Sequence, residues 1–134
     1  MHKIMALDIG TKRIGIALSD FLQIIATPLE TINRLPEEIA LETISKIAKE
    51  NHVEKIVVGV PINMDGSYGF QAQDCINFSQ KILGFDIIQE DERLTSEEAE
   101  VRLRARKVDF RKNKGLIDME SAAIILEQYL SRQR

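Results

Sequence analysis

The chain has 134 residues, of which 44% are hydrophobic and 29% are charged, and its formal net charge is −3. These values are typical of a single globular domain spanning residues 1–134, and no apolar run reaches the roughly 20 residues that a membrane-spanning helix needs. One cysteine and two histidines exclude an internal disulfide and a Cys/His zinc site, so we expect a cytoplasmic protein.

The N-terminal part of the chain predicts three strands in an antiparallel meander. Residues 4–7 and 14–18 are apolar runs joined by a tight turn at 10–12, which is the pattern of a β-hairpin. Residues 21–32 continue as a further extended segment that contains Pro28. Because proline cannot donate to a strand ladder, this third strand is expected at a sheet edge.

The middle of the chain alternates helices with short strands. Residues 36–50 begin with a proline and two glutamates, a favourable helix start, and carry an apolar stripe at helical spacing. Residues 56–60 are continuously apolar, as in a parallel strand covered on both faces, and 85–89 predict another strand. In the helix between them we expect Cys75 as a small core residue, Gly84 as the cap, and a core face of Ala72, Ile76, Ser79, Ile82 and Leu83.

The C-terminal part predicts two helices separated by a basic loop. Thr95 and Glu98 match a capping box for a helix over 96–106. Residues 107–115 follow neither the helical nor the strand period and are expected to form a mobile loop. The last helix, 117–130, has one packing face composed of Asp118, Ser121, Ala122, Ile125 and Tyr129.

The predicted order is β-β-β-α-β-α-β-α-α. A meander followed by right-handed βαβ crossovers predicts an α/β fold with a central mixed five-stranded sheet flanked by helices.

Positive charge is concentrated near the C-terminus. Residues 102–114 contain seven lysines or arginines and one acidic residue, whereas the rest of the chain contains 11 basic and 20 acidic residues. Such a segment either binds a polyanion or is a solvated helix end and loop.

Acidic residues stand where strands end or a helix begins. Asp8 ends the first strand, and Asp118 opens the last helix. Asp91 and Glu92 follow the last strand. Functional groups gather at strand carboxyl ends in open α/β sheets, and Mg²⁺ prefers oxygen ligands; two such ions ~4 Å apart would activate water for phosphodiester hydrolysis. Each acid also has a structural reading, as a turn residue, a solvated strand end or a helix cap.

Four spaced motifs resemble those of the YqgF/RuvX family, described as Holliday junction resolvases and pre-16S rRNA nucleases. The resemblance runs in order over nearly the whole chain and fits the family's size. It rests on Leu7 to Asp20, Gly59-Val60-Pro61 through Asn63-Met64-Asp65-Gly66, Asp91 to Ser96, and Asn113-Lys114-Gly115 through Asp118, Ser121, Ala122 and Ile125.

This resemblance implies a ribonuclease H-like fold and RuvC-like nuclease chemistry that uses Mg²⁺ or Mn²⁺. The family's acidic triad would fall on Asp8, Glu92 and Asp118, as both metal ligands and catalytic residues, with Glu92 chosen over Asp91 from the family's pattern. Nucleic acid is the expected partner. The expected phosphate-binding residues are Lys12, Arg13 and Arg93 beside the acids, and Arg111, Lys112 and Lys114 in the basic segment.

Four functions fit these residues. The first is a nuclease that trims the 5′ end of precursor 16S rRNA, with ribosomal particles as partners. The second is a resolvase of branched DNA, for which a symmetric homodimer rather than a monomer would be suited; no aromatic-rich dimer seam is evident, which favours RNA. The third is an ATPase of the sugar kinase and actin type, which needs two such domains, whereas 134 residues supply about one. The fourth is a non-catalytic RNA-binding module on the ribosome.

Overall fold

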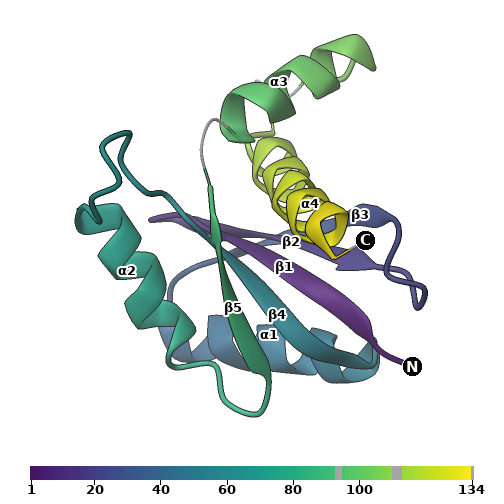
Figure 1. Ribbon diagram of the computed structural model, residues 1–134, viewed down its shortest axis with the longest axis vertical. Helices are drawn as coiled ribbons and strands as arrows, with labels where there is room; N and C mark the ends of the chain where they lie inside the picture. Colours follow the sequence, from purple (N-terminus) through teal and green to yellow (C-terminus); the bar gives the residue numbers. More distant parts are fainter. Residues whose placement is uncertain (93–94, 110–112, 134) are drawn as a thin grey trace.

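A mixed five-stranded sheet forms the centre of the computed structural model, which describes residues 1–92, 95–109 and 113–133 (Figure 1). The strands lie in the order β3-β2-β1-β4-β5, with β1–β2 and β2–β3 antiparallel and β1–β4 and β4–β5 parallel. This confirms the predicted mixed sheet with its N-terminal meander. The elements are β1 (Lys3–Ile9), β2 (Arg13–Ser19), β3 (Ala26–Asn33), α1 (Glu37–Glu50), β4 (Val53–Val60), α2 (Phe70–Ser79), β5 (Asp86–Asp91), α3 (Thr95–Ala105) and α4 (Gly115–Arg132).

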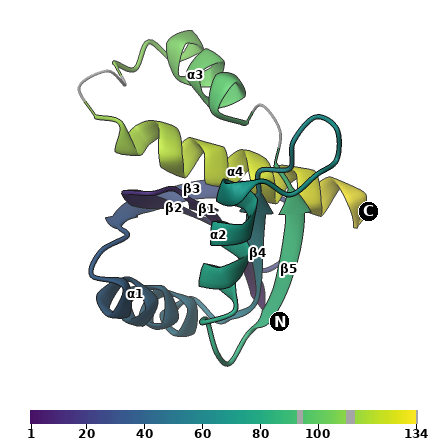
Figure 2. The same ribbon diagram turned by 90° about the vertical axis from the view of Figure 1, so that its left-hand side faces the viewer.

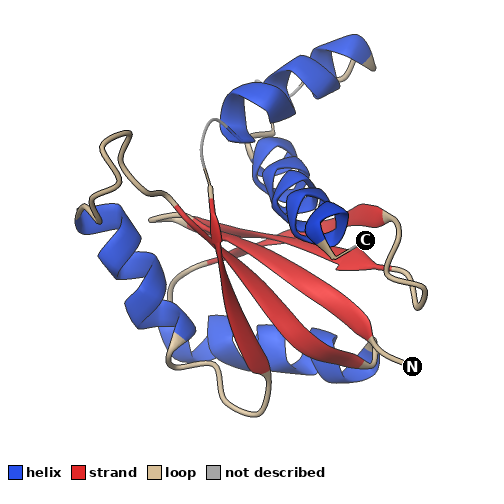
Figure 3. Ribbon diagram, in the orientation of Figure 1, coloured by secondary structure: helices blue, strands red, loops and turns tan. Residues whose placement is uncertain are grey.

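Helices cover both faces of the sheet (Figure 2). On one face, α1 and α2 contribute Ile44 and Phe78 to a core that includes Met5 and Leu7 of β1. On the other face, α4 packs on Ile4 and its alternate neighbours. Figure 3 shows α3 beyond α4, outside the two layers that touch the sheet. The β1 and β4 strands therefore have apolar side chains on both faces, as the continuous apolar run 56–60 predicts for β4.

The meander is closed by a tight turn and ends at a sheet edge. Gly10 donates its N–H to the carbonyl of Arg13 at 2.8 Å, which joins β1 to β2. β3 is an edge strand, and Pro28 lies within it. A register shift between Ile16 and Ala17 accompanies this pairing. The edge position predicted from Pro28 is confirmed.

The helix after β4 is shorter than predicted. α2 ends at Ser79, and short turn bonds from Lys81 to Phe78 and from Ile82 to Ser79 take the chain off the helical course. Leu83 is therefore 80% exposed instead of lying on the core face. Gly84, with φ of +91°, lies in the turn before β5 and does not cap the helix.

The core face of α2 combines Ala72 and Ser79, which were predicted for it, with Cys75 and Phe78, which the periodicity placed beside it. Ala72, Cys75, Phe78 and Ser79 are buried. The Cys75 thiol, 3% exposed, donates to the carbonyl of Ile9 at 3.4 Å. Cys75 is thus a core residue, as predicted.

The C-terminal helices begin earlier than their sequence signals indicate. α3 starts at Thr95, and α4 starts at Gly115, inside the segment predicted to be a loop. Residues 110–112 of that loop lie outside the described part of the chain, as do Arg93 and Leu94. In the described part, no helix is both long and apolar enough to cross a bilayer.

Candidate active site

The three predicted acids, Asp8, Glu92 and Asp118, line one open cleft of about 520 Å³. Asp8 comes from β1, Glu92 directly follows β5, and Asp118 lies in the first turn of α4. The cleft is therefore at the carboxyl ends of parallel strands, where sequence reasoning expected it. Its remaining lining consists of Ile9, Gly10, Thr11, Lys12, Arg13, Pro61, Gln71, Asp74 and Glu97.

Strand alternation decides which way Asp8 faces. Ile4 and Ala6 pack in the cluster formed with α4, whereas Leu7 packs in the cluster on the opposite face. Since side chains two apart share a face, Asp8 lies on the α4 side. A charged residue at that place interrupts an otherwise apolar face, and it does so where the cleft opens.

A close approach of α4 to β2 brings Asp118 to the same place. Gly15, the cross-strand partner of Asp8, has no side chain, and a Cβ there would lie 2.0 Å from the main-chain oxygen of Asp118. The Thr31 hydroxyl also donates to the carbonyl of Gly115 at 2.6 Å. These two contacts fix the first turn of α4 against β2 and β3.

A second glycine leaves room for Glu92. A Cβ on Gly59 would lie 2.8 Å from Oε2 of Glu92 and 2.5 Å from Cδ1 of Ile125. The Glu92 N–H donates to the carbonyl of Val60 at 2.9 Å, so pairing with β4 continues past the end of β5. Glu92 is part of the cleft lining, and Asp91 is not.

The carboxyl of Asp8 is set in an environment that disfavours its charge. Burial raises the pKa of Asp8 well above its usual range, and the neighbouring charge of Glu92, a hydrogen bond with the Glu92 side chain, and the charge of Asp118 raise it further. Desolvation and like charges both penalise the ionised form. Such a strongly perturbed group in a cleft marks a functional-site candidate.

Asp118 is held by a cation from the first position of β2. Nε of Arg13 donates to Oδ2 of Asp118 at 2.6 Å. Lys12 lines the cleft beside it, so both predicted cations of the turn adjoin the acids. Within residues 1–92, 95–109 and 113–133, no three acidic, histidine or cysteine side chains already converge to hold one metal ion.

The donor set nevertheless fits a hard divalent cation in its chemistry. All three groups are carboxylates, the ligand type that Mg²⁺ and Mn²⁺ prefer. Their mutual repulsion, evident in the raised pKa of Asp8, is the kind of charge that such an ion offsets. Asp118 is, in addition, paired with Arg13.

Sequence reasoning missed an ion pair that joins the buried Arg34 to Asp74 in the cleft lining. Arg34, at the end of β3, donates to both carboxylate oxygens of Asp74 in α2, at 2.7 and 2.9 Å. It also donates to the carbonyl of Gly10 at 3.0 Å, and its own N–H reaches the carbonyl of Lys12 at 2.9 Å. Arg34 thereby holds both sides of the β1–β2 turn. No local sequence pattern predicts this pair, because its members are 40 positions apart.

The basic segment is less available for nucleic acid than its charge suggests. Arg102 forms two hydrogen bonds with Glu127, at 2.6 and 3.0 Å, and Arg106 lies 2.9 Å from Glu120. Two of its cations thus hold α3 on α4. Lys114 is exposed just before α4. The predicted phosphate ligands Arg93, Arg111 and Lys112 lie outside the described residues.

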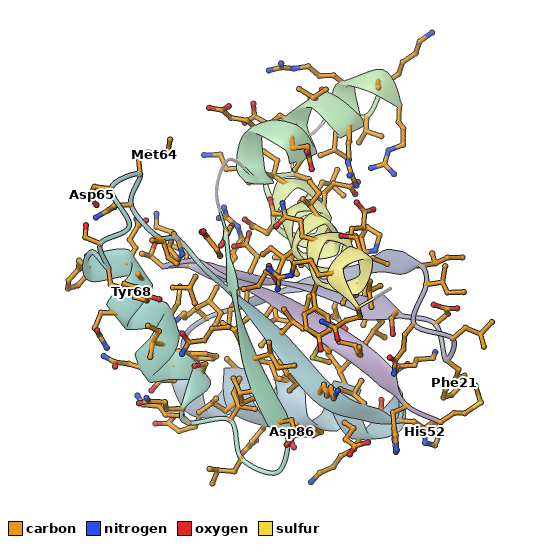
Figure 4. The ribbon with its side chains drawn as sticks, viewed as in Figure 1. Phe21, His52, Met64, Asp65, Tyr68 and Asp86 are labelled. Atoms are coloured by element: carbon orange, nitrogen blue, oxygen red, sulfur yellow. The ribbon has the colours of Figure 1, made fainter. Side chains whose placement is uncertain are left out.

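The opposite end of the sheet carries different features. Figure 4 shows Phe21, His52 and Asp86 far from Met64 and Asp65, which belong to the loop after β4. The Phe21 and His52 rings are 6.0 Å apart. The cleft belongs to the Met64 end, because Pro61 at the start of that loop is part of its lining.

The fold is that of a ribonuclease H-like domain. The chain superimposes on Thermus thermophilus RuvC in complex with a Holliday junction with a TM-score of 0.60, at 11% identity, over 99% of this chain and 96% of that one. Fowlpox virus resolvase with junction DNA gives the same TM-score and identity over 98% of each chain. At such identity the likeness shows the fold alone.

Sequence comparison gives the family. The family model RuvX, described as Holliday junction resolvase, matches residues 2–132. A Halothermothrix orenii protein named as a candidate pre-16S rRNA nuclease is 45% identical over 98% of this chain and 96% of its own length. A Picosynechococcus protein of the same name is 44% identical, over 97% and 92%. The chain belongs to the RuvX family of nucleases, which confirms the resemblance carried by its four motifs.

Proposed function

We propose that this protein is a divalent-metal-dependent nuclease that hydrolyses phosphodiester bonds at the 5′ end of precursor 16S rRNA. The observation that carries the proposal is the meeting of Asp8, Glu92 and Asp118 in one cleft beside Lys12 and Arg13. The name shared by the relatives supports an RNA substrate. The protein would act in the cytoplasm on precursor ribosomal particles.

The proposed roles follow from the chemistry of the side chains. Asp8, Glu92 and Asp118 would hold Mg²⁺ or Mn²⁺, which when bound activates water and stabilises the leaving oxygen, with two ions as the arrangement we favour. Lys12 and Arg13 bind a phosphate next to the cleaved bond, since guanidinium pairs with phosphate through two parallel hydrogen bonds. Lys114, together with Arg93, Arg111 and Lys112, extends this contact along the nucleic acid.

The test is to incubate the protein and Mg²⁺ with a precursor rRNA that carries its 5′ extension. Primer extension then maps the position and the extent of cleavage. Wild-type protein should cut, and Asp8→Asn, Glu92→Gln and Asp118→Asn should each be slower by about 10² or more, because each removes a ligand charge. Asp91→Asn is the matched control, since it removes the charge next to Glu92 but outside the cleft lining, and it should keep most activity. Equal cleavage by wild type and Asp8→Asn would remove the catalytic assignment.

A second candidate is hydrolysis of branched DNA by the same residues. The family's description and the two junction-bound structural neighbours favour it. A four-way junction has two-fold symmetry, so this activity calls for a symmetric dimer. Parallel assays on a four-way junction and on precursor rRNA, with the oligomeric state measured by light scattering, separate the two. A monomer that leaves junctions intact and cuts rRNA supports the first proposal.

A non-catalytic role on the ribosome predicts a different genetic result. If the acids only stabilise the fold, charge-neutral triad variants should complement a deletion strain. We expect them to fail while accumulating to the wild-type level. In both roles affinity for RNA should fall steeply with salt, since phosphate contacts release counterions.

A further inference from the structure

In the contact between Arg13 and Asp118, the guanidinium occupies a carboxylate that the proposed function requires as a metal ligand. The Nε–Oδ2 distance is 2.6 Å, and the two side chains are 37% and 21% exposed. We propose that Arg13 couples the two halves of the site: it occupies Asp118 until a substrate phosphate draws its guanidinium away, and only then does Asp118 join Asp8 and Glu92 as a metal ligand. This inference rests on the proposed function and adds an order of binding to it.

Competition for Asp118 follows from charge. Arginine cannot lose its proton in a protein, so the guanidinium stays cationic for as long as it holds the carboxylate. A divalent cation at Asp118 would therefore meet a like charge a few ångströms away. Arg13 and the metal cannot both have Asp118 as a close partner without that repulsion.

A phosphate offers Arg13 an alternative partner. The ion pair uses Nε, and in the described part of the chain the two terminal nitrogens of Arg13 have no protein acceptor. Arg13 lines the cleft, so these donors are accessible to an incoming phosphate. A phosphate bound through Nε and one terminal nitrogen forms two parallel hydrogen bonds and replaces the single one to Asp118.

The contacts around α4 identify which partner moves. The first turn of α4 is fixed by its close approach to Gly15 and by the hydrogen bond from Thr31 to Gly115. Arg13 is at the first position of β2, next to the turn, and reaches Asp118 with a long side chain. Rotation of the Arg13 side chain therefore frees Asp118 without displacing the helix.

Coupling of this kind is reciprocal. If phosphate binding makes Asp118 available, the nucleic acid must tighten metal binding, and the metal must tighten nucleic-acid binding by the same factor. A coupling of about tenfold lies within the usual range for linked sites.

The experiment is a Mn²⁺ titration of the full chain, in which the electron paramagnetic resonance signal measures the concentration of free Mn²⁺. The titration is done twice, once without nucleic acid and once with a phosphorothioate RNA of the precursor 5′ leader. A gel checks that this RNA stays intact. Wild type should bind Mn²⁺ about tenfold more tightly with RNA. Arg13→Gln should bind Mn²⁺ about tenfold more tightly than wild type without RNA, and RNA should add little.

Lys12→Gln is the matched control, because it removes the same charge from the same cleft but not from Asp118. Without RNA, Lys12→Gln should therefore not show the gain of about tenfold in Mn²⁺ affinity that is expected of Arg13→Gln. If Arg13→Gln binds Mn²⁺ no better than wild type without RNA, while Asp118→Asn loses Mn²⁺, the coupling is wrong and the metal site stands. If neither wild type nor Arg13→Gln binds Mn²⁺ at all, the metal-dependent function and the coupling both fail.

Discussion

Arg34 donates two parallel hydrogen bonds to Asp74, and the same guanidinium donates to the carbonyl of Gly10 in the turn that carries Lys12 and Arg13. The Arg34 side chain is only 10% exposed, and its guanidinium carbon lies 5.0 Å from the centre of the Phe78 ring. One residue therefore holds the end of β3, the β1–β2 turn and α2 together at the wall of the cleft.

Replacement of Arg34 by methionine should lower the free energy of unfolding by about 2 kcal/mol, because it leaves Asp74 and the Gly10 carbonyl without their donor. Urea unfolding followed by circular dichroism measures this. Arg102→Met is the control, because its pair with Glu127 is more exposed and should cost less than about 1 kcal/mol. Equal losses in the two variants would contradict the structural role assigned to Arg34.

Asp74 makes part of the stability dependent on pH. The hydrogen bond with Arg34 holds the pKa of Asp74 below its usual range. A lowered folded-state pKa stabilises the fold above the unfolded value of about 3.9, and this contribution disappears as the pH falls through the folded pKa. The stability difference between wild type and Asp74→Asn should thus be full at neutral pH and shrink in acid. Urea midpoints measured across this range test it, and a difference that stays constant would exclude the pair as its source.

Cys75 should be chemically inert in the native protein. Burial, and then the negative charges of Glu92, Asp74 and Asp8, raise the pKa of its thiol to about 12. Only the thiolate is nucleophilic, so a thiol reagent at pH 8 should react slowly until urea unfolds the chain. Rapid native labelling would show that the cleft and the α2 core are more open than described.

Gly59→Ala should separate activity from stability. The added Cβ meets the carboxylate of Glu92 and the end of Ile125, which are side-chain atoms that can shift. We expect a loss of nuclease activity on the order of 10²-fold, since small displacements of catalytic groups are costly.

The control for Gly59→Ala is Gly84→Ala, whose new Cβ meets no atom within 4 Å but whose φ of +91° strains a side-chain-bearing residue. It should lose about 1–2 kcal/mol of stability and keep its activity. If Gly59→Ala stays fully active, nuclease activity does not depend on the present position of Glu92, which would contradict the role assigned to this residue.

Sequence patterns predict the helices and strands of this fold better than they predict where those elements contact one another closely. The hairpin and the central strand follow from apolar runs, and the edge position of β3 follows from Pro28. Leu83 was misplaced, because periodicity continues past the point where turn bonds end α2. The roles of Gly15 and Gly59 depend on neighbours that are distant in sequence, so no local signal gives them.

The site shows the same division. The three acids were predicted at the ends of elements and do line one cleft. The contacts of Arg13 with Asp118 and of Arg102 with Glu127 were not predicted. They depend on where α4 packs, and that is decided by tertiary contacts rather than by spacing. For this reason the charge of residues 102–114 overstated the surface available to a polyanion.

The central claim is that Asp8, Glu92 and Asp118 form one metal site, and anomalous diffraction from a crystal of the protein with Mn²⁺ and a phosphorothioate RNA tests it most directly. The account predicts a Mn²⁺ peak in the cleft with oxygens of all three carboxylates as ligands, and Arg13 turned from Asp118 to a phosphate. A saturated crystal with no Mn²⁺ between these carboxylates, or with the ion bound elsewhere while RNA occupies the cleft, would contradict it.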